Sequence, residues 1–168
     1  MEKGLSYFDL AENDYQFLQY DWKAGRIGNI MCSAAQNICE RYLKHIIDTY
    51  VLEVDTTSIL QTHSLRALRR FITEKIPNFK ADWRTILQAD GYYFSTRYPG
   101  DSAFLVGKDD VDECWESVEV TRLAALQYIK FKELEIQNSV KDKRLTDENV
   151  SKDAKQGASQ SSMHRGCR

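Results

Sequence analysis

The feature that most constrains the fold is a stripe of apolar residues between positions 26 and 52. Apolar side chains recur there at alternating spacings of three and four, the pattern of an α-helix with one buried face. The stripe is wide, and its small pair Ala34-Ala35 would let a neighbouring helix approach closely. We therefore predict a central helix of a bundle. The stripe consists of Ile27, Ile30, Met31, Ala34, Ala35, Ile38, Cys39, Tyr42, Leu43, Ile46 and Ile47.

Four further segments have the apolar spacing of helices, with few breakers between them. The whole chain of 168 residues holds only two prolines, which favours long helices over short strands. Gly25 is expected to follow the end of the first helix, Thr62 to cap the third, and Gly91 to permit a kink or a local break inside the fourth. We predict an all-α fold, an up-and-down bundle of about five helices. The expected helices cover residues 5–24, 26–52, 63–75, 81–98 and 109–137.

The composition changes after residue 137. Residues 1–137 hold 16 Lys and Arg against 21 Asp and Glu, a net charge of −5, whereas residues 138–168 hold 7 against 4, a net charge of +3. The second segment has no aromatic residue and few large aliphatic ones, so it cannot bury enough surface to order itself. We predict a helical domain over residues 1–137 and a disordered polar tail over residues 138–168. The acidic domain is not a basic nucleic-acid platform, although a local basic patch is compatible with it.

Several functional classes have no support in the sequence. The four cysteines form no CxxC pair and no zinc-type cluster, so neither a metal site nor a cofactor is expected. The chain lacks GxGxxG, GxxxxGK[ST], HExxH and GxSxG motifs. No apolar window is long enough to span a membrane, and the first residues do not have the pattern of a signal peptide. A cytoplasmic location is the resulting expectation.

The central helix carries two pairs of polar residues spaced four apart. Glu40 and Lys44 would form an ion pair, which on an exposed face would contribute only about 0.3–0.5 kcal/mol. Arg41 and His45 form a second pair one step around the helix. His63 begins the third helix, where it either bonds a nearby backbone group or projects toward a ligand.

Two stretches could contact phosphate. Arg66, Arg69 and Arg70 give the third helix a basic edge, which is either a phosphate contact or a solvated face. Arg97 lies near the end of the fourth helix in the stretch YFSTRYPGD, where a cation is favourable with the helix dipole. Tyr93 and Tyr98 flank it and could stack against a base.

Taken in order, these motifs resemble the HEPN family, small helical domains of higher eukaryotes and prokaryotes. The resemblance covers about residues 5–130 and rests on three elements. AAQNICERYLKHII is similar to the family's A…E…LK pattern, through Ala35, Glu40 and Lys44. THSLRAL is similar to its TH-x-L element, and Arg97-Tyr98-Pro99 to its RYP element.

The resemblance implies two alternative functions. Some family members are metal-independent ribonuclease toxins, with an arginine and a histidine separated by four to six residues on a late helix. Arg41 and His45 are separated by three residues and lie on the second helix. The sequence is more similar to the branch of non-catalytic companions of small nucleotidyltransferases, which includes toxin–antitoxin-like pairs. It has no nucleotidyltransferase GS…DxD signature of its own.

The first hypothesis is therefore a non-catalytic module that binds a nucleotide or nucleic acid as a homodimer, with a separate nucleotidyltransferase as a candidate partner. Its expected ligand-binding residues are Glu40, Lys44, His63, Arg97 and Tyr98. The second hypothesis is a divergent ribonuclease that uses Arg41 and His45. The third is a protein-interaction bundle without a ligand, which an exposed apolar patch on the first two helices would favour.

Overall fold

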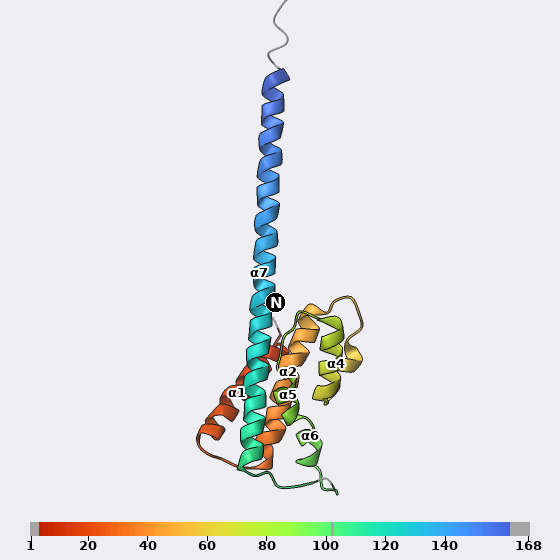
Figure 1. Cartoon of the computed structure of the whole chain (residues 1–168), viewed down its shortest axis with the longest axis vertical. Helices are drawn as coiled ribbons and strands as arrows, with labels where there is room; N and C mark the ends of the chain where they lie inside the picture. The colour runs from red at the N-terminus through yellow and green to blue at the C-terminus, as the bar shows by residue number, and fades with distance from the viewer. Residues whose placement is uncertain (1–3, 102, 162–168) are drawn as a thin grey trace, which may run out of the picture. The chain divides into compact units, whose positions relative to one another are not determined.

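The computed structural model describes residues 4–101 and 103–161, with side chains as far as residue 141. These residues form helices and connecting segments without any strand, which confirms the predicted all-α fold (Figure 1). Four helices are long: α1 (Tyr7–Lys23), α2 (Asn29–Tyr50), α4 (Leu65–Lys75) and α7 (Lys108–Ser161). The others have a single turn each: α3 (Thr57–Leu60), α5 (Trp83–Ile86), the 3-10 helix η1 (Leu87–Ala89) and α6 (Tyr92–Ser95).

Local signals in the sequence explain both ends of α1. The Ser6 hydroxyl accepts a hydrogen bond from the Asp9 amide at 3.2 Å, and the Asp9 carboxylate accepts one from the Ser6 amide at 2.8 Å. This reciprocal capping box pairs two amides that would otherwise lack acceptors. At the other end, Gly25 has a φ of +70° and its amide donates to the carbonyl of Trp22 at 2.9 Å. The predicted glycine after the helix is thus confirmed.

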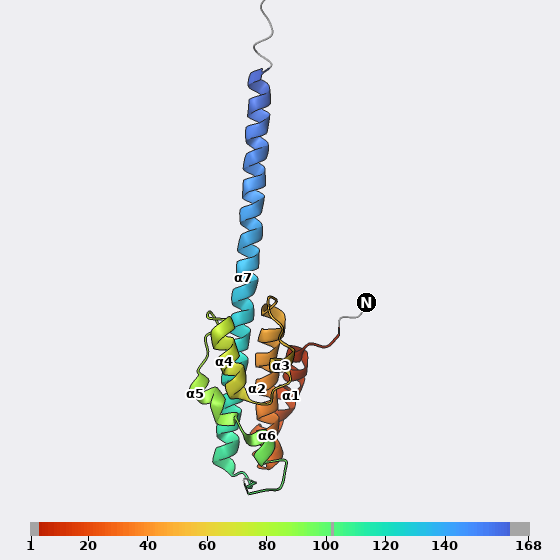
Figure 2. The same cartoon turned by 90° about the vertical axis from the view of Figure 1, so that its right-hand side faces the viewer.

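Helix α2 lies at the centre of the bundle, with α1 on one side and α4 on the other (Figures 1 and 2). The predicted stripe explains this position, since Ile38, Leu43 and Ile46 are fully buried. The first turns of α7 complete the core, where the Trp115 ring stacks on Tyr15 at 5.4 Å and on Trp22 at 5.2 Å between centroids.

A polar clamp joins three helices at the edge of this core. The Glu12 carboxylate accepts hydrogen bonds from Arg122 Nε at 2.7 Å, from Arg122 Nη2 at 3.0 Å and from the Tyr42 hydroxyl at 2.7 Å. Burial opposes ionisation of Glu12, but the hydrogen bonds from Arg122 and Tyr42 prevail and lower its pKa. The clamp fixes α1 and α7 against α2.

Cysteines occupy the centre of the bundle as small apolar groups, among them Cys32 and Cys39, of which Cys39 belongs to the predicted apolar stripe. Both are fully buried, and so is Cys114. Burial raises the pKa of the Cys39 thiol to about 12, so this side chain stays a neutral packing group.

The expected helix at residues 81–98 is wrong as one continuous helix, but the local break expected at Gly91 is present: the segment forms α5, η1 and α6. The break occurs where Gly91 adopts a φ of +103°, a conformation that no helix accommodates and that glycine adopts without steric cost. The expected cap at Thr62 is also wrong. Ser64 caps α4 by accepting from the Ala67 amide at 3.3 Å, while Thr62 accepts from the Ser64 amide at 3.2 Å.

The last helix is longer than the sequence predicted, since α7 continues beyond residue 137 to Ser161. Residues 162–168 of the expected tail lie outside the described residues. The chain divides into one compact unit over residues 1–128 and another over residues 129–168. The candidate site lies in the first unit. None of the described helices combines the length and apolar character needed to cross a membrane.

Candidate functional site

The site begins with a row of polar side chains inside the apolar bundle. Gln36, Glu40 and Lys44 follow one another at intervals of four along α2, and at most 6% of each residue is exposed. Lys44 Nζ lies 3.3 Å from Glu40 Oε2. The ion pair is therefore buried, and the small contribution expected for an exposed face does not apply to it. Because buried charges are costly unless they are paired and hydrogen-bonded, such a row requires partners from other elements.

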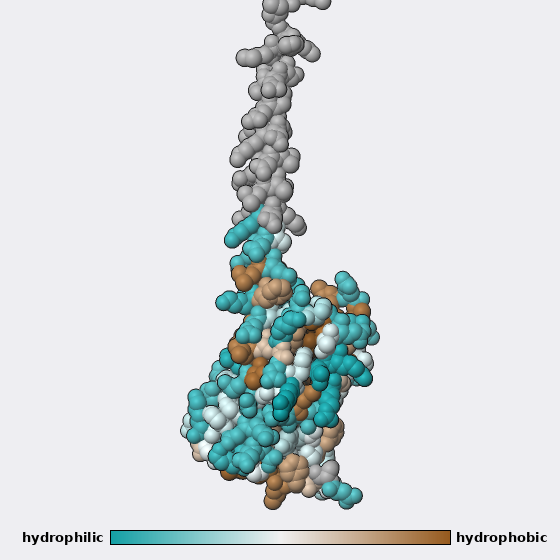
Figure 3. All heavy atoms as spheres, in the orientation of Figure 1, coloured by the Kyte–Doolittle hydropathy of each residue, from teal (hydrophilic) through white to brown (hydrophobic). Residues whose placement is uncertain are grey.

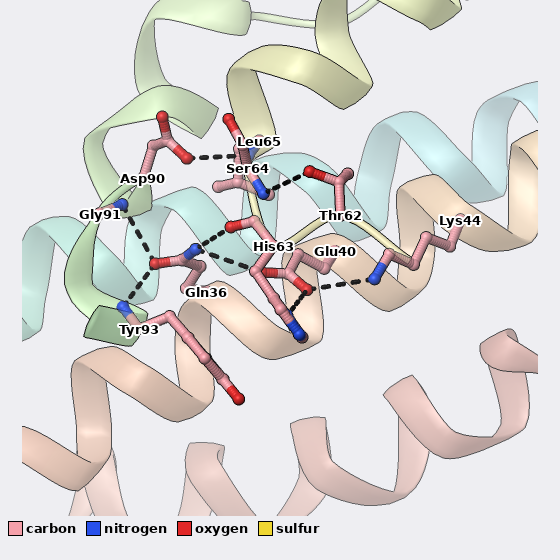
Figure 4. Close-up of polar contacts among 10 residues, drawn as sticks. All are labelled: Gln36, Glu40, Lys44, Thr62, His63, Ser64, Leu65, Asp90, Gly91 and Tyr93. Carbon is pink, nitrogen blue, oxygen red and sulfur yellow. Dashed lines mark hydrogen bonds and ion pairs between the residues drawn. The ribbon is translucent and has the colours of Figure 1, made fainter. Parts of the chain in front are cut away.

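Gln36 is the hub of these partners (Figure 4). Its amide nitrogen donates to the His63 carbonyl at 2.6 Å and to Glu40 Oε1 at 3.2 Å. Its amide oxygen accepts from the backbone N–H of Gly91 at 3.1 Å and of Tyr93 at 2.7 Å. One side chain thus holds the segment before α4 and the start of α6 against α2.

Asp90 makes a second connection between the same two segments. Its Oδ1 accepts from the Leu65 amide in the first turn of α4 at 2.8 Å, and its Oδ2 lies 3.4 Å from Arg66 Nε. The amide groups of the first helical turn have no acceptors within the helix, so this carboxylate also favours the start of α4.

Glu40 connects the buried row to the surface. Its Oε2 contacts both Lys44 Nζ and, at 3.1 Å, His63 Nδ1. The Glu40 side chain is 1% exposed, whereas the His63 side chain is 43% exposed. The carboxylate therefore fixes the imidazole by Nδ1, while part of the ring faces solvent.

The imidazole of His63 stacks on Tyr93. The two rings are nearly parallel, at 4° between planes and 4.3 Å between centroids, and the guanidinium carbon of Arg97 lies 4.6 Å from the centroid of the same tyrosine ring. Arg97 follows the one-turn helix α6, so its position reflects this contact and not the end of a long helix as predicted from the sequence.

Two more aromatic side chains extend the surface outward. Phe94 packs edge-on against Tyr93 at 5.1 Å between centroids and stacks on Tyr98 at 6.3 Å. Phe94 and Tyr98 are each 57% exposed. A shallow hollow of about 270 Å³ adjoins them, lined in part by Arg97, Tyr98 and Asn29. We call the set of His63, Tyr93, Phe94, Arg97 and Tyr98 the aromatic surface.

The family model for the HEPN domain matches residues 1–125, which include the whole site. The chain belongs to the HEPN family. No curated protein and no solved structure matches the chain. Family membership favours a function that involves nucleotides or RNA, and the polar row of α2 with the aromatic surface is the candidate place for it.

The structure brings all five predicted ligand-binding residues of this HEPN domain into one cluster. Glu40, Lys44 and His63 are in direct contact, Arg97 joins them through Tyr93, and Tyr98 joins through Phe94, as the distances above show. Sequence reasoning gave Gln36 no role. The sequence feature that could have identified Gln36 is its position one helical turn before Glu40 in the polar row.

Arg41 and His45 face a different element. Arg41 forms an ion pair with Asp14 of α1, and the His45 ring packs against Phe8 of α1 at 5.3 Å between centroids. His45 Nδ1 also lies 3.4 Å from the Thr49 hydroxyl. Both residues of the ribonuclease hypothesis thus contact the first helix of the HEPN bundle, away from the contacts that build the aromatic surface.

Proposed function

We propose that this HEPN protein is a non-catalytic module that binds a nucleotide or nucleic acid on the aromatic surface. The observation that carries the proposal is the group of three side chains at its centre. Arg97 lies over Tyr93, and His63 stacks on the same ring. Arg97 is exposed and the His63 side chain is 43% exposed, so a ligand can reach both.

The chemistry of these groups matches that of a nucleotide. Exposed aromatic rings such as Phe94 and Tyr98 offer faces on which bases stack, a contact that contributes about 1–3 kcal/mol per base. The planar guanidinium of Arg97 can form two parallel hydrogen bonds to a phosphate. Its contact with Tyr93 restricts the side chain before the ligand arrives, which lowers the entropy lost on binding.

Glu40 and Lys44 support the surface from below in this proposal. Both are buried, so they contribute by holding His63 in place, whereas the ligand meets His63, Arg97 and Tyr98. Glu40 acts as the positioning residue, because its carboxylate contacts both His63 and Lys44.

An apolar groove supports the proposal that the protein assembles with a second chain. The groove has a volume of about 670 Å³ and lies between α1 and α2, where Phe17 and Tyr20 are each 71% exposed and Ile30 is 69% exposed. Large apolar side chains gathered in this way mark sites of protein association. We propose a homodimer through this groove. A nucleotidyltransferase is the alternative partner, and an interaction bundle without ligand is the alternative function.

Ligand binding is tested by thermal unfolding of the purified protein with mono-, di- and trinucleotides and short RNA. A ligand at about 100 times its dissociation constant stabilises the fold by about 2.7 kcal/mol. We expect Arg97→Ala to abolish this shift. Arg26→Ala should retain it, since Arg26 is exposed and pairs with Asp21 at the turn between α1 and α2. Absence of a shift with every ligand would overturn the proposal.

Assembly is tested separately by light scattering during size-exclusion chromatography. We expect a dimer in the wild type and a monomer after Phe17→Ser with Ile30→Ser, with unchanged helix content by circular dichroism. A wild-type monomer at high concentration would exclude the homodimer. A dimer that persists in the double variant would place the interface elsewhere.

A further inference from the structure

A second surface on the domain has the chemistry of a phosphate site and no role so far. It is a groove of about 490 Å³ along α4 (Figure 3 shows mainly hydrophilic side chains over this helix). Arg69 and Arg70 lie three and four residues after Arg66, so the three side chains share one side of α4. The groove is lined by Arg66, Arg69, Arg70, Thr73, Glu74 and Leu87.

The positive charge of this groove is largely available to a ligand. Arg66 pairs with Asp90 but its side chain remains 74% exposed, and Arg69 and Arg70 are exposed as well. The Glu74 carboxylate is held by Lys75 at 2.8 Å. Among the described residues, neither Arg69 nor Arg70 forms an ion pair, although the charge of Arg70 adds to the effect of Lys75 in lowering the pKa of Glu74.

The groove and the aromatic surface are built from the same two chain segments. The first runs from His63 into α4 and its arginines. The second runs from Leu87, which lines the groove, to Tyr93 and Arg97. Asp90 joins the segments beside Arg66, and Gln36 joins them again beside His63 and Tyr93. The two surfaces are therefore linked through a hydrogen-bonded junction.

We propose that the α4 groove holds backbone phosphates of a single-stranded nucleic acid whose bases rest on the aromatic surface. The ligand is then an oligonucleotide that spans both surfaces. This inference rests on the proposed function and narrows its ligand class. A single strand fits because stacking on protein side chains requires bases that are not paired in a duplex. An acidic peptide would satisfy the arginines but would leave the aromatic faces without partners.

The test measures fluorescence anisotropy of labelled RNA from two to twelve nucleotides long, at several salt concentrations. We expect affinity to rise with length, and Arg69→Ala with Arg70→Ala to remove this gain while dinucleotide binding stays unchanged. The slope of log K against log salt should fall by about 1.4 in that variant, since each phosphate contact on a single strand contributes about 0.7.

Two controls isolate the role of the groove. Lys23→Ala with Arg26→Ala removes the same charge at an exposed turn and should leave the length dependence intact. Arg69→Lys with Arg70→Lys retains the charge and should restore most of the slope. Both arginines are exposed, and an unchanged melting temperature will verify that the alanine variant is folded. DNA strands of the same sequence and length show whether the protein prefers RNA or DNA, which share the phosphate backbone. Tighter binding of RNA would indicate contact with the 2′-hydroxyl.

The outcomes separate this inference from the proposed function. Binding that depends on Arg97 but ignores Arg69 and Arg70 would overturn the inference and leave the function in place. Tighter binding of duplex RNA or of a poly-glutamate peptide than of single strands would also overturn it. Absence of binding at any length, or binding unaffected by Arg97→Ala, would instead overturn the proposed function.

Discussion

The imidazole of His63 lies parallel to the phenol ring of Tyr93, with 4.3 Å between the ring centroids. The two residues are far apart in sequence and belong to different segments, yet each is fixed to α2 by the same side chain, Gln36. The guanidinium of Arg97 lies over the same Tyr93 ring. The placement of the exposed Arg97 guanidinium thus depends on a stack that the buried side chains of Gln36 and Glu40 hold in place.

Replacing Tyr93 should therefore impair ligand binding without unfolding the protein. Tyr93→Leu removes the ring on which Arg97 and His63 rest, and we expect binding of short RNA to weaken about tenfold, as for the loss of about 1.4 kcal/mol. Tyr93→Phe keeps the ring and is the matched control. Anisotropy titrations of both variants test this, and equal affinities for the two would contradict the role of the ring.

Replacing Gln36 should reduce stability because its partners are backbone groups. Gln36→Leu leaves the amides of Gly91 and Tyr93 without their acceptor, and each unpaired amide costs about 1–3 kcal/mol when it is shielded from water. We expect a loss of at least about 2 kcal/mol in the free energy of unfolding by urea. Gln88→Leu, at an exposed position, is the control and should change the stability little.

Gly91 should resist substitution for a reason that lies in its backbone. A β-carbon there would meet no atom within 4 Å, but the φ of +103° is strained for any L-amino acid. Gly91→Ala should thus cost about 1–2 kcal/mol. Gly100→Ala is the control, since it is equally open and has no such φ. Equal stability of the two variants in urea would show that the backbone at Gly91 is not constrained.

The clamp at Glu12 should make stability depend on pH. The pKa of Glu12 is lowered in the folded protein, so its contribution is complete above the unfolded value of about 4.3 and is lost as pH falls through the folded value. Arg122→Met should cost about 2 kcal/mol at pH 7. The difference in unfolding free energy between this variant and the wild type should become smaller below about pH 4, as measured by urea titrations. Arg69→Met, at an exposed site where the residue forms no ion pair among the described residues, should leave the pH profile unchanged.

The ribonuclease hypothesis makes a contrasting prediction for Arg41 and His45. Because both pack on α1 through Asp14 and Phe8, we expect His45→Ala to change stability modestly and to leave RNA intact or degraded to the same extent as in wild type. The assay incubates RNA with chelator and compares both proteins. Cleavage that survives chelation and disappears in His45→Ala would establish the enzymatic alternative.

The sequence by itself determined the helical class and much of the central helix. The apolar residues of the central helix, among them Ile38, Leu43 and Ile46, recur with the period of an α-helix. An apolar stripe of this width must be covered by neighbouring elements on several sides. The glycine after α1 and the small buried cysteines were equally readable, because local conformation and side-chain volume decide them. Even the five candidate site residues could be selected from motifs, although their contacts could not.

Only the tertiary structure decided what those residues do. An interval of four residues places Glu40 and Lys44 on one helix face, whether that face is solvated or buried. Packing of the segment before α4 decided that this face is buried. At the break that Gly91 permits, the tertiary structure supplies Gln36 as the acceptor for the Gly91 amide. The stack of His63, Tyr93 and Arg97 joins residues from separate segments, and helical periodicity carries no information about such long-range contacts.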